Sequence, residues 1–220
     1  MIRLPRLYSI IDSSFFPTIS EVLAFADALA SAGCTLLQYR NKSGNARVML
    51  DQARELRRRF APLSQNPHSV AQIATRVGQP NLIINDRADL CLAADFDGVH
   101  VGQDDLSPES VRKIIGPDRW LGVSTHNPEQ VQEADLTSAD YLAIGPVFAT
   151  SSKENPDPVL GLEGVRRARE LTRKPLVAIG GITRANAARV IEAGADSVAV
   201  ISDLIRDPRK SAEEFLRILR

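Results

Sequence analysis

The stretch NLIINDRADLCLAADFDGVHVGQDD, residues 81–105, holds two short apolar runs, LII and GVHV, and acidic residues follow each of them. Asp86 follows the first run, and Asp104 and Asp105 follow the second. Runs that are apolar throughout, rather than alternating, are typical of parallel strands covered on both faces. The segment ADLCLAA between them is predicted as a short helix. The stretch therefore predicts a strand–helix–strand unit with carboxylates where both strands end.

The same alternation of strand and helix continues along the chain. Eight apolar runs are predicted as strands, at residues 7–12, 34–40, 81–86, 98–101, 120–125, 141–147, 175–182 and 197–202. Eight such units in 220 residues predict an α/β fold, a (β/α)8 TIM barrel that forms a single domain over residues 1–220. An open doubly wound sheet is the competing fold. It would scatter the polar strand ends along an edge, whereas a barrel gathers them in one mouth.

Several helix starts carry recognisable signals. The Thr18–Glu21 segment reads as a capping box ahead of an apolar helical pattern. Ser107-Pro108 and Asn127-Pro128 each place a capping side chain before a proline at the first helical position. Two further helices are predicted, one over residues 45–60 and a last one from about Ser211.

Charge and composition limit the class of protein. Lys plus Arg and Asp plus Glu number 27 each, so no net field attracts nucleic acid or an anionic membrane. No apolar run has the length of a secretory signal or a membrane span. Cys34 and Cys91 are interpreted as small core residues of a protein in the reducing cytoplasm. We therefore expect a cytoplasmic protein with small-molecule ligands, and the sequence carries no signal for an oligomeric state.

The acidic residues after the third and fourth strands suggest a metal site. A barrel would bring Asp86 and Asp105 together at its mouth. Two carboxylates without a Cys or His cluster suit Mg²⁺ better than Zn²⁺. A structural role is the alternative, in which Asp86 caps the following helix and Asp104 or Asp105 caps a turn.

Basic residues lie at other strand ends. Arg40 and Lys42 follow the second strand, and Lys153 follows the sixth. Any one of them alone would be an ordinary solvated charge. Three cations facing a metal held by carboxylates would form a site for a polyanion such as diphosphate.

A second anion site is indicated after the last two strands. Gly180 and Gly181 end the seventh strand, and Ile201 and Ser202 end the eighth. The loops at this position commonly hold phosphate in such barrels. The alternative is an ordinary helix-entry turn built from small residues.

The connections include two long segments. Residues 148–160 form a long polar loop after the sixth strand, which we interpret as an active-site lid. Residues 61–81 are longer than a helix-to-strand turn requires, and we expect a loop there with a short helix around residues 69–76. His126 could act as an acid or base or serve as a structural hydrogen-bonding residue, whereas His100 is interpreted as a hydrogen-bonded core histidine.

Taken together, these motifs resemble the thiamine-phosphate synthase family. The resemblance follows the family's order from the second strand to the eighth, through QYRNK, INDRADL, GVHVGQDDL, GVSTHN, GPVFATSSK, LGLEG, AIGGIT and GADSVAVIS. It implies a (β/α)8 barrel and a Mg²⁺-dependent transferase. The implied reaction joins 4-amino-5-hydroxymethyl-2-methylpyrimidine diphosphate to 4-methyl-5-(2-phosphoethyl)thiazole or its carboxylate, giving thiamine phosphate, diphosphate and, from the carboxylate, CO2.

The resemblance also assigns roles to individual residues. It implies that the pyrimidine diphosphate is bound by Gln38, Arg40, Lys42, Asn85, Ser124 and Lys153, with Arg40, Lys42, Ser124 and Lys153 as the catalytic set. It implies a thiazole phosphate site formed by Thr150, Ser152, Gly181, Ile201 and Ser202, and a Mg²⁺ site formed by Asp86 and Asp105. The family's lid usually reads Thr-x-Thr-Lys, and here Ser152 replaces the second threonine.

Two other functions use the same type of fold. A thiazole tautomerase is an isomerase on this barrel, and His126 would suit it, but it would not need the acidic pair and the Gln38, Arg40 and Lys42 set together. A sensor that binds a phosphorylated ligand without catalysis is the other alternative, and the full set of acids and lysines argues against it.

Overall fold

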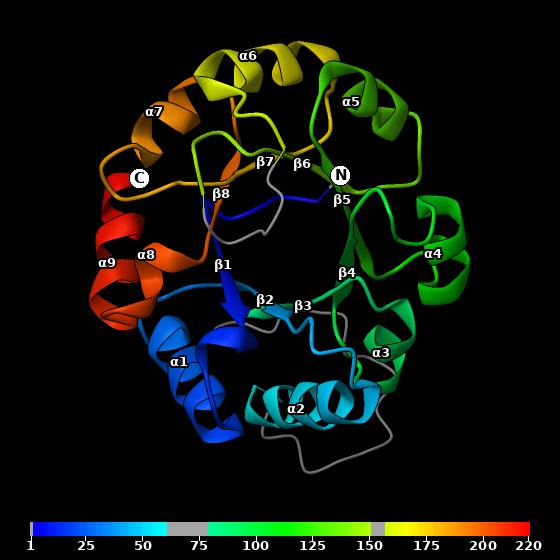
Figure 1. Ribbon diagram of the computed structural model, residues 1–220, viewed down its shortest axis with the longest axis vertical. Coiled ribbons are helices and arrows are strands. Elements are labelled where there is room, and N and C mark those ends of the chain that lie inside the picture. Colours follow the sequence, from blue (N-terminus) through cyan, green and yellow to red (C-terminus); the bar gives the residue numbers. More distant parts are fainter. Residues whose placement is uncertain (1, 61–78, 151–156) are drawn as a thin grey trace.

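The computed structural model describes residues 2–60, 79–150 and 157–220. Within these residues, parallel strands form a closed barrel in which β8 pairs with β1, and the helices surround it as an outer ring (Figure 1). The strands are β1 (Leu7–Asp12), β2 (Leu36–Arg40), β3 (Asn81–Asn85), β4 (Gly98–Val101), β5 (Trp120–Thr125), β6 (Tyr141–Ile144), β7 (Leu176–Ile179) and β8 (Ser197–Val200). The predicted (β/α)8 barrel is confirmed, and the open sheet is excluded.

The helices begin largely where the capping signals place them. The capping box at Thr18 is formed, and Ser107 and Asn127 accept the backbone N–H of the third helical residue. The last helix begins at Pro208 rather than near Ser211, because Asp207 caps it ahead of the proline. The described helices are η1 (Ser13–Phe15), α1 (Ile19–Ser31), α2 (Ala46–Arg59), α3 (Ala88–Ala93), α4 (Pro108–Ile115), α5 (Pro128–Asp135), α6 (Gly161–Leu171), α7 (Ala187–Glu192), α8 (Ser202–Ile205) and α9 (Pro208–Ile218).

Alternate residues of each strand face different cores. One apolar cluster lies between the barrel and its helices and includes both cysteines, which are free thiols. A second, smaller cluster fills the barrel and includes Tyr8, Ile10, Ile83, Tyr141 and Val177. This double burial explains why the strands are apolar on both faces. The alternation also directs the last inward residue of each strand toward the mouth.

A repeated contact ties the strands together at their amino ends. Asp97, Asp140 and Asp196 each precede an even-numbered strand, and each carboxylate accepts a 2.8 Å hydrogen bond from a backbone N–H of the preceding strand. Each also pairs with an arginine of an even-numbered helix, the pairs being Asp97 with Arg57, Asp140 with Arg112 and Asp196 with Arg169. Contacts at this end of the barrel serve stability, since barrel enzymes carry their chemistry at the other end.

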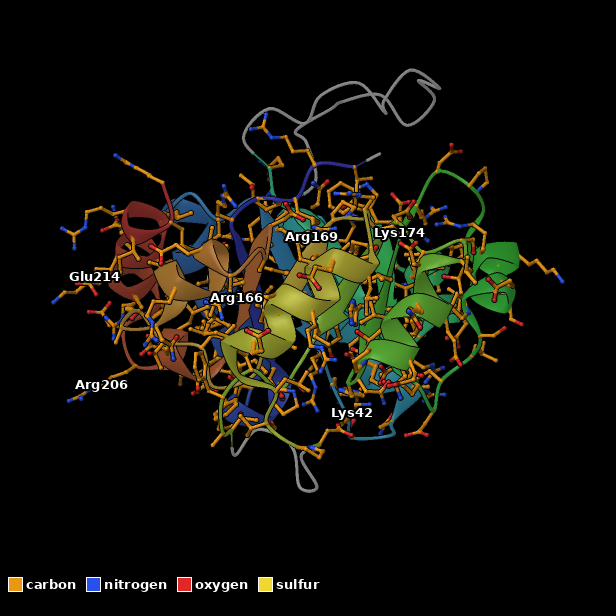
Figure 2. The ribbon with its side chains drawn as sticks, turned by 90° about the horizontal axis from the view of Figure 1, so that it is seen from above. Lys42, Arg166, Arg169, Lys174, Arg206 and Glu214 are labelled. Atoms are coloured by element: carbon orange, nitrogen blue, oxygen red, sulfur yellow. The ribbon has the colours of Figure 1, made fainter. Side chains whose placement is uncertain are left out.

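The two ends of the barrel are distinguished in the side view. Lys42, which follows β2, lies at the opposite edge of the molecule from Arg169 and Lys174, which lie near the start of β7 (Figure 2). The carboxyl ends of the strands therefore open on the Lys42 side. Among the described helices, none is long and apolar enough to cross a membrane.

Candidate functional site

The first charged pair of the mouth joins β1 to β2. Asp12 and Arg40 are register partners at the last position of their strands, and the guanidinium donates to the Asp12 carboxylate. The other carboxylate oxygen of Asp12 accepts from the backbone N–H and the hydroxyl of Ser14, at 3.0 and 2.7 Å. Sequence reasoning missed Asp12, although it ends a strand in the same way as the other acids. Its buried carboxylate holds Arg40 at the mouth.

The second pair joins the ends of β2 and β3. The ammonium group of Lys42 donates to Asp86 Oδ2. Asp86 has a φ of 63°, in the left-handed region that residues other than glycine adopt at a cost of about 1–3 kcal/mol, and such strain gathers at functional sites. The capping alternative for Asp86 is wrong, because α3 begins at Ala88 after Arg87 and has no side-chain cap.

The third acid of the mouth lies beside the second. Burial raises the pKa of Asp105, and the neighbouring Asp86 carboxylate raises it further. Asp105 also accepts the backbone N–H of Gly102 at 2.8 Å, so the predicted turn contact exists for one of its oxygens. Two close carboxylates repel one another, and a cation bound between them would relieve this repulsion.

The chemistry of this acidic pair fits Mg²⁺. Within the described part of the chain, no group of three or more His, Cys, Asp or Glu side chains is placed to hold a metal. The ligands that Asp86 and Asp105 offer are carboxylate oxygens. Mg²⁺ is commonly held by one or two carboxylates, with water and substrate phosphate as its other ligands.

Asn85 contributes an unused hydrogen-bond donor. It ends β3, points to the same side of the strand as the barrel-filling Ile83, and is buried. Its Nδ2 has no hydrogen-bond partner among the residues that the structure describes. Because a buried donor without a partner costs about 1–3 kcal/mol, a ligand that accepts this bond would recover that free energy.

Gln38 and Ser124 occupy the barrel interior below the charged pairs. Gln38 Nε2 donates to the Tyr8 hydroxyl at 2.8 Å. Ser124 Oγ lies 2.9 Å from His100 Nε2. His100 is buried and hydrogen bonded, as predicted. The two predicted pyrimidine contacts are therefore held by residues that the sequence did not single out as site residues.

The ends of β7 and β8 lie beside the loop that follows β6. Gly181 has a φ of 62°, and a Cβ there would lie 2.4 Å from the Ala149 carbonyl oxygen. This contact, rather than an approach to a phosphate alone, requires glycine. The short helix α8 begins at Ser202, and Ile201 is the residue before it. The adjacent Asp203 carboxylate accepts from the backbone N–H and Nε of Arg184, at 2.9 and 3.1 Å, which offsets its charge near an anion site.

Only some of the other predicted site residues lie within the described part of the chain. Thr150 lies within the described residues, whereas Ser152 and Lys153 lie outside them, as does most of the 61–81 segment with its predicted short helix. The lid over residues 148–160 thus remains a prediction. His126 Nδ1 lies 2.7 Å from the Gly145 carbonyl oxygen, which fits the structural role considered for it.

The fold and the mouth define a (β/α)8-barrel protein whose site presents acids, cations and an unpaired amide at the strand ends. Comparison with known proteins narrows this class. A family model described as thiamine monophosphate synthase matches residues 7–204. The chain therefore belongs to the thiamine monophosphate synthase family.

Individual relatives agree with this assignment. The chain is 56% identical to the thiamine-phosphate synthase of Koribacter versatilis, over 99% of this chain and 97% of that protein. It is 41% identical to the thiamine-phosphate synthase of Chloroflexus aurantiacus, over 97% and 92% of the two chains. A solved thiamine phosphate pyrophosphorylase from Pyrococcus furiosus has a TM-score of 0.79 and 34% identity, covering 97% of this chain and 95% of that one. The resemblance seen in the motifs is confirmed, and these relatives do not support the isomerase or sensor alternatives.

Proposed function

We propose that this protein is a transferase that joins 4-amino-5-hydroxymethyl-2-methylpyrimidine diphosphate to 4-methyl-5-(2-phosphoethyl)thiazole, or to its carboxylate, at the carboxyl end of the barrel. Membership of the family supports the synthase activity. The observation that carries the proposal for the site is the pairing of Arg40 with Asp12 and of Lys42 with Asp86, beside the unpaired amide of Asn85. This arrangement offers donors and cations to a diphosphate.

The reaction needs no protein nucleophile. The bond between the pyrimidine methylene carbon and the diphosphate oxygen breaks, and its electron pair leaves with diphosphate. The thiazole nitrogen then uses its lone pair to form the new C–N bond, and the carboxylate substrate also loses CO2 and takes up a proton at the carbon that carried it. Arg40, Lys42 and Lys153 would neutralise the departing diphosphate, and Ser124 would hold one of its oxygens. The work of the protein is positioning and charge compensation.

Mg²⁺ is part of the proposal, with Asp86 and Asp105 as its protein ligands. The two carboxylates lie together and offer only oxygen atoms, which suits this ion. When bound, Mg²⁺ would supply counter-charge to the leaving diphosphate. Asp104 is assigned no ligand role.

The thiazole phosphate is assigned to the loops after β6, β7 and β8. Thr150 and Ser152 would contact it from one side, and Gly181, Ile201 and Ser202 from the other. The close approach of Gly181 to Ala149 supports this assignment, because it places the two loops next to each other. Barrel enzymes often bind phosphate at the loops after strands 7 and 8.

A cytoplasmic location also belongs to the proposal, supported by the two buried free cysteines Cys34 and Cys91. The activity is tested by incubating the purified protein with both substrates and Mg²⁺ and measuring thiamine phosphate and diphosphate. One equivalent of each product per turnover is expected. Product formed without the thiazole substrate, or none with both substrates present, would refute the proposal.

A further inference from the structure

A network of hydrogen bonds crosses the barrel interior and joins two of the proposed pyrimidine contacts. Gln38 Nε2 donates to the Tyr8 hydroxyl at 2.8 Å, and the Tyr8 and Tyr141 hydroxyl oxygens lie 3.0 Å apart. The Tyr141 hydroxyl lies 3.1 Å from His100 Nδ1, and His100 Nε2 lies 2.9 Å from Ser124 Oγ. We call this the Gln38–Ser124 network. It connects β2 to β5 through side chains of β1, β6 and β4.

The backbone leaves room for the centre of this network. Gly122 is the register partner of both Tyr141 and His100. A Cβ at Gly122 would lie 2.1 Å from Tyr141 Cζ and 2.4 Å from His100 Nδ1. Gly122 does not have a positive φ, so the requirement for glycine is steric. Any side chain there would separate Tyr141 from His100.

The network has a direction. Each phenol carries one hydrogen, and Tyr8 accepts from Gln38, so the arrangement that uses every hydrogen has Tyr8 donating to Tyr141. Tyr141 in turn donates to His100 Nδ1. Because Nδ1 accepts this hydrogen bond, the hydrogen of the imidazole ring lies on Nε2. That hydrogen is donated to Ser124, whose own O–H is left for another acceptor.

The ends of the network therefore present fixed and different atoms. Among the described residues, none donates a hydrogen bond to Gln38 Oε1, and that oxygen is left as an acceptor. Ser124 is left as a donor. A chain of buried hydrogen bonds with a single direction resists reversal at one end, because every member must turn together.

We propose that Tyr8, Tyr141 and His100 are positioning residues that hold Gln38 with its carbonyl oxygen toward the pyrimidine and Ser124 with its hydroxyl hydrogen toward the diphosphate. This inference rests on the proposed function. The exocyclic amino group of the pyrimidine is an N–H donor that matches Gln38, and phosphate oxygens match Ser124. A 4-oxo pyrimidine would instead set a carbonyl oxygen against the Gln38 acceptor. The network thus selects the amino over the oxo pyrimidine.

The substitution Tyr141→Phe tests this selection. Without the Tyr141 hydroxyl, Tyr8 has no acceptor in the network except Gln38. The Gln38 amide then turns over to accept from Tyr8 and presents Nε2 to the ligand. Calorimetry with Mg²⁺ gives the dissociation constants of the 4-amino and 4-oxo pyrimidine diphosphates. We expect their ratio to be at least about 100 in the wild type and to fall by about tenfold or more in Tyr141→Phe.

Tyr39→Phe is the matched control. Tyr39 is also a buried tyrosine, next to Gln38 on β2, but it faces the helices and bonds to Asn41 and Gln52. Tyr39→Phe removes a phenol oxygen and its hydrogen bonds, as Tyr141→Phe does. An effect that came only from lower stability would therefore appear in both variants. The affinity ratio should stay at its wild-type value in Tyr39→Phe. A Tyr141→Phe variant that keeps the wild-type ratio would overturn the inference.

A second measurement uses the wild type alone. ¹⁵N NMR of the histidine side chains reports which ring nitrogen carries the hydrogen, and the His100→Asn variant identifies the His100 signals. We expect hydrogen on Nε2, and hydrogen on Nδ1 would overturn the direction of the network. A wild type that makes thiamine phosphate but fails these tests overturns only this inference. A wild type that binds neither pyrimidine overturns the proposed function as well.

Discussion

The ammonium group of Lys42 contacts the same carboxylate, Asp86, that is proposed to bind Mg²⁺. The lysine thus supplies the counter-charge at a position where Asp105 adds a second negative group. A cation entering between the two acids must compete with Lys42. In the proposed complex, bound diphosphate would give Lys42 another anion to contact, and Asp86 would then be free to bind the metal.

Removing Lys42 should therefore increase the affinity for metal in the absence of substrate. Lys42→Met should bind Mn²⁺, a spectroscopic substitute for Mg²⁺, about tenfold more tightly than the wild type, because a competing charge is lost. Electron paramagnetic resonance of free Mn²⁺ measures this directly. Lys113→Met, on the exposed face of α4, is the control and should bind like the wild type. Equal or weaker binding by Lys42→Met would show that Lys42 does not compete.

The acidic pair should matter for rate and not for folding. Asp86→Asn and Asp105→Asn should each lower kcat by about a hundredfold or more, since the leaving diphosphate loses counter-charge. Their melting temperatures should change little, because Asp105 already suffers from burial and from its acidic neighbour. Asp104→Asn is the control and should retain activity. If Asp104→Asn is inactive while Asp105→Asn is active, the metal assignment is wrong.

The fold could be predicted from the sequence because its signals are local. Continuous apolar runs gave the strands, and capping residues such as Thr18, Ser107 and Asn127 gave the helix starts. Asp207-Pro208 is a start signal of the same kind, and α9 begins at that proline. These patterns depend on neighbours in sequence, so a single sequence is sufficient.

The contacts of the site depend on register and could not be predicted in that way. Asp12 meets Arg40 because β1 and β2 pair with those two residues opposite each other. Tyr8 reaches Tyr141 across the barrel, at a separation of 133 residues. In the sequence, nothing distinguishes Gly122 from other small strand residues. The structure shows that Tyr141 and His100 leave no room for a side chain there. The sequence pattern predicts which residues face inward. It does not predict which of them are in contact, because that depends on strand register.

The two phosphate sites should respond differently to a charge at α8. Ser202→Asp places a carboxylate at the proposed thiazole phosphate site, where it would repel the ligand. The KM for the thiazole phosphate should rise about tenfold or more, and the KM for the pyrimidine diphosphate should change much less. Ser202→Asn, similar in size and neutral, is the control. Equal increases of both KM values in Ser202→Asp would mean that the two pockets are assigned wrongly.

The amino end of the barrel should contribute to stability without affecting catalysis. Asp140 accepts from the Leu121 backbone N–H and pairs with Arg112. Asp140→Asn should lower the free energy of unfolding by about 1–3 kcal/mol, because it weakens a charge-assisted contact to a partly buried arginine. Chemical denaturation measures this, and kcat should stay near the wild-type value. The exposed Asp118→Asn is the control, and a loss of stability as large in that variant would argue against a specific role for Asp140.

Acid should destabilise the protein through His100. Its pKa is lowered by burial from 6.5 to about 4, with Asp105 opposing the shift. Between these two pH values the unfolded chain binds a proton that the folded protein does not. The stabilisation is therefore fully present above pH 6.5 and is lost as the pH falls toward 4. The full shift corresponds to roughly 3 kcal/mol.

The contribution of His100 is measured as a difference between two proteins. The raised pKa of Asp105 acts in the opposite direction, favouring the folded state at low pH, and it is present in both. The free energy of unfolding of the wild type and of His100→Asn should be compared from pH 7 down to pH 4. Because asparagine does not titrate, the stability of the variant should decline less steeply over this range. Parallel curves for the two proteins would show that His100 is protonated as easily in the folded state as in the unfolded chain, and that its ring is not held neutral between Tyr141 and Ser124.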